Sequence, residues 1–70
     1  MATAVVHVRF EGRSADIPLG DLDVGMRSSD DQVRRALAEY YRVPAEKFAP
    51  YIVERHDNGN MTVRPEAVFG

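Results

Sequence analysis

The sequence contains no cysteine. Disulfide bonds, thiolate zinc sites and a cysteine nucleophile are therefore excluded. Small secreted domains usually depend on disulfides or a bound metal, because their hydrophobic cores are small. The sequence also shows no signal peptide and no apolar run long enough to span a membrane. Together these features predict a cytoplasmic protein with no membrane contact.

An excess of basic residues is missing as well. Nine Lys and Arg stand against eleven Asp and Glu, so the formal net charge is −2. Nucleic-acid binders usually carry a concentrated positive excess, so nucleic acid is a disfavoured partner. Binding to nucleic acid through Arg9, Arg55 and Arg64 is a minor alternative, and it predicts strongly salt-dependent association.

Motifs for metal binding and catalysis are also lacking. His7 and His56 fall in different predicted hairpins and have no acidic third ligand, so we interpret both as surface residues. Residues 21–25 lack the third ligand and the glutamate of a calcium loop. Ser28 and Ser29 have no nucleophile elbow around them, and helix capping explains them better. We therefore expect no catalytic residue, metal or cofactor, and a protein that is not an enzyme.

What is present is a pattern typical of one folded domain covering residues 1–70. Hydrophobic residues make up 44% of the chain and charged residues 29%, which is ordinary for a globular protein. Residues 4–10 alternate between apolar and mixed positions, as in a strand with one buried face. The apolar set is Ala4, Val6, Val8 and Phe10, and the residues between them are Val5, His7 and Arg9.

A second strand follows, with Ala15, Ile17 and Leu19 as its apolar set. A two-residue turn at residues 11–12 or at residues 12–13 keeps the apolar faces of the two strands together, and both alternatives remain open. Pro18 cannot donate a hydrogen bond to a neighbouring strand, which places this strand at an edge of the sheet.

The middle of the chain predicts one amphipathic helix. Residues 20–27 are expected to form a connecting loop, with Leu22 and Val24 tucked into the core. Ser29 and Gln32 have the spacing of a capping box, which predicts the start of a helix over residues 30–42. Its expected core face is Val33, Ala36, Leu37 and Tyr40, and Tyr41 is expected to be a partly exposed contact.

Pro44 limits the helix, because the residue before a proline avoids the helical region. Residues 45–48 are expected to form a short turn anchored by Phe48. A second hairpin then pairs Tyr51 and Val53 with Met61 and Val63. A three-residue loop with Gly59 in the left-handed region is the register that keeps these apolar residues on one face.

The order of hairpin, helix and hairpin over about seventy residues resembles the β-grasp fold shared by ubiquitin and small sulfur carriers. The resemblance implies an α+β fold of ββαββ order. Its mixed sheet of four strands has the order 2-1-4-3, with the first and last strands parallel at the centre. It also implies that the helix covers one face of the sheet, above Val6, Val8, Phe10, Val53 and Val63.

The face of the sheet away from the helix is the predicted binding surface, because ubiquitin-like domains commonly dock partners there. We expect a non-enzymatic protein-interaction module, monomeric or weakly dimeric, that binds an unknown protein partner. Its predicted face consists of Val5, His7, Arg9, Ile52, Thr62 and Arg64, with a further contact from the tail residues Val68, Phe69 and Gly70.

The alternative is a modifier or sulfur carrier that is activated at its C-terminal carboxylate. Such proteins end in Gly-Gly, whereas this chain carries Phe69 before Gly70.

Overall fold

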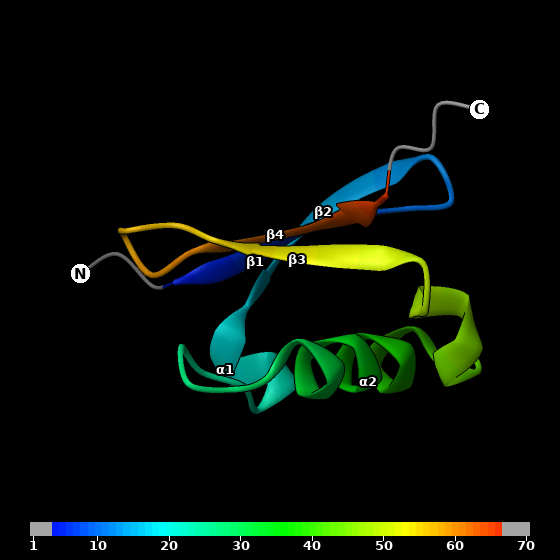
Figure 1. The fold of residues 1–70 in the computed structure, drawn as a ribbon, viewed down its shortest axis with the longest axis horizontal. Helices are drawn as coiled ribbons and strands as arrows, with labels where there is room; N and C mark the ends of the chain where they lie inside the picture. Colours follow the sequence, from blue (N-terminus) through cyan, green and yellow to red (C-terminus); the bar gives the residue numbers. More distant parts are fainter. Residues whose placement is uncertain (1–3, 67–70) are drawn as a thin grey trace.

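The computed structural model describes residues 4–66. Four strands form one mixed sheet of order β2-β1-β4-β3, and the main helix α2 lies along one face of it (Figure 1). This confirms the predicted α+β class and ββαββ order. The elements are β1 (Val5–Phe10), β2 (Arg13–Pro18), α1 (Leu19–Leu22), α2 (Asp30–Tyr41), the 3₁₀ helix η1 (Ala45–Phe48), β3 (Tyr51–Arg55) and β4 (Met61–Pro65).

The two central strands, β1 and β4, run parallel to each other. Val6 lies beside Met61, and Val8 lies beside Val63. Each central strand also pairs antiparallel with its hairpin partner, β1 with β2 and β4 with β3. The sheet therefore joins segments from both ends of the described chain, as the predicted strand order requires.

The first hairpin turns at Glu11 and Gly12. Phe10 pairs with Arg13, which settles the choice between the two turns that the sequence left open. Both turn residues have positive φ angles, 52° and 80°, as a type I′ turn requires. Pro18 lies opposite Val5 on the edge strand β2, which confirms its predicted place.

The segment predicted as a plain loop over residues 20–27 begins instead with the short helix α1, and β2 ends before Leu19. Pro18 precedes the helix with a φ of −56°, and the helix stops at Asp23 in the left-handed conformation. Leu19 and Leu22 are one helical turn apart, so both can enter the core. Leu22 is buried and Val24 packs partly buried against the core, as predicted.

Helix α2 begins with the predicted capping box. The Ser29 hydroxyl accepts a hydrogen bond from the Gln32 backbone at 3.1 Å, and the Gln32 side chain accepts one from the Ser29 backbone at 2.7 Å. The helix ends at Tyr41, because Arg42 adopts the left-handed conformation with a φ of 56°. Phe48 in the following 3₁₀ helix is fully buried, as its predicted role as an anchor requires.

Of the two tyrosines at the end of α2, Tyr40 was wrongly predicted to belong to the core, while Tyr41 is partly exposed, as predicted. Tyr40 is 51% exposed, whereas Tyr41 packs against the core, with its ring centroid 4.9 Å from that of Phe10. Tyr41 lies four residues after the buried Leu37, and its ring packs near the aromatic rings of Phe10 and Phe48. Tyr40 points to the solvent side of the same turn.

The second hairpin has the predicted three-residue loop. Val53 pairs with Val63, and Arg55 pairs with Met61. The backbone N–H of Gly59 donates to the carbonyl of His56 at 3.0 Å, and Gly59 has a φ of 91°. This is a turn followed by a glycine bulge, which keeps the apolar residues of β3 and β4 on one face.

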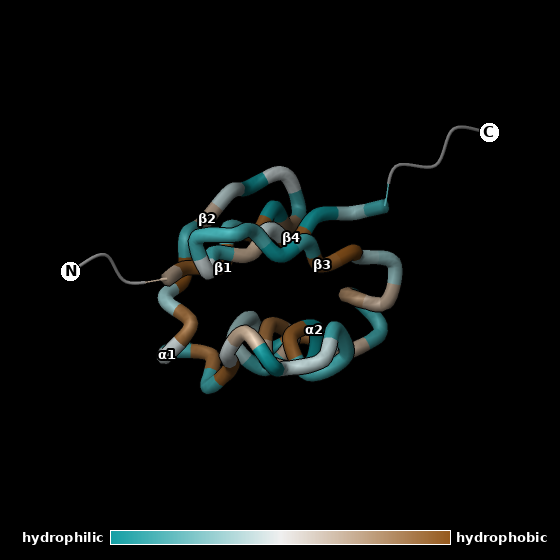
Figure 2. The backbone as a smooth tube through the Cα atoms, turned by 60° about the vertical axis from the view of Figure 1, so that its left-hand side comes forward, coloured by the Kyte–Doolittle hydropathy of each residue, from teal (hydrophilic) through white to brown (hydrophobic). Residues whose placement is uncertain are grey.

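The sheet and helix α2 face each other as two layers (Figure 2), and their buried side chains form one core cluster. Burial of these side chains is the main term that stabilises the fold. The largest fully buried side chains are Phe48, Leu37, Met61, Val6, Val8, Val33 and Val63. Within residues 4–66, no helix is long and apolar enough to cross a membrane.

Candidate functional site

The candidate site is the outer face of the sheet, which is the face opposite α2 (Figures 1 and 2). Alternate residues of a strand point to opposite faces. Since the even-numbered residues of β1 are buried under the helix, its odd-numbered residues project outward. The outer face consists of Val5, His7 and Arg9 from β1, Ser14 and Asp16 from β2, Ile52 and Glu54 from β3, and Thr62 and Arg64 from β4.

A polar row crosses the centre of this face. The strand registers place Asp16 beside His7, His7 beside Thr62, and Thr62 beside Glu54. Nδ1 of His7 lies 2.5 Å from Oδ1 of Asp16, and it must carry the proton because an ionised carboxylate can only accept. At the end of β3, Nε2 of His56 lies 2.7 Å from the Thr62 hydroxyl.

A second row contains two arginines. The Arg64 Nε donates to Oε1 of Glu54 at 2.8 Å, so its charge is partly balanced within the face. Arg9 is one residue beyond Val8, which lies beside Val63, so Arg9 and Arg64 are neighbours on the central strands. Among residues 4–66, Arg9 forms no ion pair.

The two apolar residues predicted for this face are not brought together. Val5 lies at the start of β1 opposite Pro18, whereas Ile52 lies on β3 opposite Arg64. The polar row of His7 and Thr62 separates them. Both are half-buried. The face thus has a polar centre, with Val5 towards one end of the strands and Ile52 towards the other.

Three residues of the face were missing from the predicted set: Ser14, Asp16 and Glu54. Asp16 contacts the predicted member His7, and Glu54 accepts a hydrogen bond from the predicted member Arg64. His56, one residue beyond β3, contacts Thr62. Asp16 was within reach of sequence reasoning, because either two-residue turn puts β2 alongside β1 with its even-numbered residues outward. The predicted tail residues Val68, Phe69 and Gly70 lie outside the described residues.

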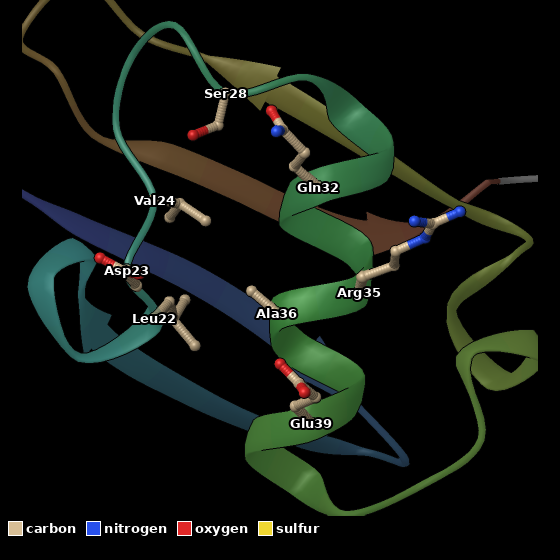
Figure 3. A pocket seen from close by; sticks show the side chains of 8 residues that line it. All are labelled: Leu22, Asp23, Val24, Ser28, Gln32, Arg35, Ala36 and Glu39. Atoms are coloured by element: carbon tan, nitrogen blue, oxygen red, sulfur yellow. The ribbon is translucent and has the colours of Figure 1, made fainter.

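A hollow of about 270 Å³ lies away from this face, between α2 and the segment that follows α1 (Figure 3). Its apolar base is formed by Leu22, Val24 and Ala36, and Arg35 of α2 is among the polar residues that line it. The Ser28 hydroxyl at its rim accepts a hydrogen bond from the Gly25 backbone at 2.9 Å. This bond gives Ser28 a structural role.

Among the groups of residues 4–66, two have shifted pKa values, and both lie off the outer face. The Arg34 guanidinium lowers the pKa of Asp31 through a hydrogen bond and its charge. Burial raises the pKa of Tyr41, with smaller effects from Tyr40 and Tyr51. Within residues 4–66, no three His, Asp or Glu side chains gather closely enough to hold a metal ion.

The comparisons with known proteins give no relative. No family model, no curated protein and no solved structure matches this chain.

Proposed function

We propose that the protein is a non-enzymatic protein-interaction module of β-grasp architecture, and that it binds a protein partner through the outer face of its sheet. The strand order and the parallel central strands support this architecture. Fold alone does not assign function, so the proposal depends on the face itself.

The observation that carries the proposal is the arrangement of side chains on a sheet face that no described element covers. His7 is held by Asp16 and Arg64 is held by Glu54. A partner that meets side chains already fixed in place loses less conformational entropy on binding. The polar centre therefore suits a partner surface that offers hydrogen bonds and carboxylates.

Ile52 and Arg64 are the pair expected to contribute most of the binding energy. They lie directly opposite each other on β3 and β4. One partner can therefore bury the half-exposed side chain of Ile52 and at the same time accept hydrogen bonds from the Arg64 guanidinium. Binding energy at protein interfaces usually concentrates in a few residues, and arginine is enriched among them.

The test is partner capture from the source cell with Ile52→Ala and Arg64→Ala variants. Each substitution should weaken capture by about tenfold, the effect of removing about 1.4 kcal/mol of binding energy. The melting temperature should change little, because neither side chain belongs to the core. Arg35→Ala, which removes an exposed arginine from α2, is the matched control and should leave capture unchanged.

Two results would count against this function. If both variants capture as well as the parent and deletion of residues 68–70 abolishes capture, the tail and not the sheet face binds the partner. If both variants unfold, Ile52 and Arg64 are structural residues, and the outer face is not a free surface.

A further inference from the structure

The edge strand β2 offers unpaired backbone groups to a further strand. The Leu19 backbone donates to the carbonyl of Ala4 at 3.1 Å, which continues the ladder between β2 and β1. Ladder bonds alternate along an antiparallel strand, so the odd-numbered residues of β2 bond to β1. Ser14 and Asp16 therefore direct their N–H and C=O groups to the open edge. Among residues 4–66, none of these four groups has a hydrogen-bond partner.

The opposite edge of the sheet is covered differently. On β3, Arg34 donates from Nη1 to the Tyr51 carbonyl at 3.1 Å. The Arg55 side chain reaches the carbonyl of Ser28 at 2.6 Å and pairs with Asp30. These two arginines tie the β3 edge to helix α2. Exposed edges are templates for pairing with other chains, and among the described residues none gives the β2 edge such cover.

We propose that two copies of this chain pair through their β2 strands, antiparallel and centred on Ala15. In this register, Ser14 of each copy lies opposite Asp16 of the second copy. Because both residues direct their backbone groups outward, each Ser14–Asp16 pair forms two hydrogen bonds. The result is one continuous sheet across the dimer, with both outer faces on the same side.

The charges and the proline favour this register over its neighbours. A shift by one ladder step in one direction sets Asp16 opposite Asp16 of the second copy, and like charges that face each other are destabilising. The same shift sets Ser14 opposite Pro18, which has no N–H to donate. A shift in the other direction sets Asp16 against the Glu11–Gly12 turn. Centring on Ala15 avoids both costs, because Pro18 then lies at the end of the paired segment.

Arg9 supplies charge complementarity across the dimer. It projects from β1 beside Ser14, and Ser14 lies opposite Asp16 of the second copy. Neighbouring strands are about 4.8 Å apart, so Arg9 and that aspartate are separated by roughly 10 Å, with a small serine between them. An arginine side chain can reach over the serine, so the dimer gives Arg9 the carboxylate it lacks among the described residues.

Sedimentation velocity over a wide concentration range tests the dimer. We expect a monomer–dimer equilibrium that weakens as salt is added. Arg9→Glu should raise the dimer dissociation constant by roughly tenfold, because each dimer contains two of these charge pairs. Combining Arg9→Glu with Asp16→Arg should restore much of the affinity. Arg35→Glu makes the same change in net charge on α2 and should have little effect.

Disulfide cross-linking tests the register, since the parent chain contains no cysteine. On the two-fold axis the two Ala15 Cα atoms would be about 4.5 Å apart, within the range that a disulfide bridges. Ala15→Cys should therefore cross-link much faster than Ala49→Cys, which places a thiol on an exposed alanine beyond η1.

A chain that stays monomeric at every concentration would overturn the proposal. So would a dimer in which Ala15→Cys cross-links no faster than Ala49→Cys, or in which Arg9→Glu acts no more strongly than Arg35→Glu. The dimer is read by sedimentation and cross-linking of the isolated protein, whereas the proposed function is read by partner capture with variants on β3 and β4, so failure of one can be told from failure of the other.

Discussion

Leu37 is a fully buried core residue of helix α2, so its truncation should be costly. Its side chain is fully buried, together with Val8 and Val63 of the two central strands. Leu37→Ala removes buried carbon atoms and leaves a cavity, so it should lower the free energy of unfolding by about 2–5 kcal/mol. Urea denaturation measures this loss.

Tyr40→Ala is the matched control on the same helix, because Tyr40 is largely exposed; it should cost much less than Leu37→Ala. If Leu37→Ala leaves too little folded protein to measure, Leu37→Met keeps most of the volume and should cost less than about 1.5 kcal/mol. A loss below about 1 kcal/mol for Leu37→Ala would show that α2 is not packed on the sheet as described.

The exposure of Tyr40 shows what helical periodicity leaves open. Spacing alone placed Tyr40 on the stripe of Val33 and Leu37. In the structure the buried face of the helix includes Ala38 and Tyr41 instead of Tyr40. Tyr41 is there because its ring packs near those of Phe10 and Phe48 at this end of the helix. Those rings come from other elements, so the sequence of the helix does not reveal them.

At the scale of elements, two glycines should respond in opposite directions to alanine. Gly59 has a φ of 91°, and a Cβ there would meet Ala4 and Met26 only at ordinary contact distance. Gly59→Ala should therefore destabilise through backbone strain alone, by about 1–2 kcal/mol. Gly20 lies within helix α1 with open space around it, so Gly20→Ala should stabilise by about 0.5–1 kcal/mol.

Thermal unfolding checks both changes, since about 1 kcal/mol corresponds to a shift of roughly 4–8 °C for a domain of this size. A neutral Gly59→Ala would contradict the left-handed glycine bulge that sets the register of β3 and β4. A destabilising Gly20→Ala would show that the short helix α1 is not formed in solution.

The hairpins were predictable from local sequence, and the segment between β2 and α2 was only partly so. A turn of known length fixes which residues face each other across a hairpin, so Val53 opposite Val63 followed from the loop that ends at Gly59. Helix α1 spans only four residues. One helical turn is too short to show a period, and burial of Leu19 and Leu22 against the core stabilises it.

At the scale of the whole molecule, the arrangement of the outer face depends on pairing between distant segments. The sequence predicted that Val5, His7 and Arg9 would share a face with Thr62 and Arg64. No turn joins β1 to β4, so only the folded sheet shows that His7 lies beside Thr62. That register creates the polar row and separates Val5 from Ile52.

The same sheet predicts a pattern of amide hydrogen exchange along β2. In dilute protein, the N–H groups of Ala15 and Ile17 should exchange slowly because they bond to β1, while those of Ser14 and Asp16 should exchange quickly at the open edge. On the central strand β1, all N–H groups should be protected, because they bond alternately to β2 on one side and face β4 on the other. Residue-resolved exchange measured by NMR reads this alternation directly.

Raising the protein concentration then connects the exchange pattern to pairing between copies. Slower exchange at Ser14 and Asp16 alone, with Ala15 and Ile17 unchanged, is the result expected if a second β2 strand covers the edge. Slowing at Val53 and Arg55 instead would place the contact on β3, where Arg34 and Arg55 now tie the edge to α2. Uniform protection of Ser14 and Asp16 at every concentration would mean that the β2 edge is never open.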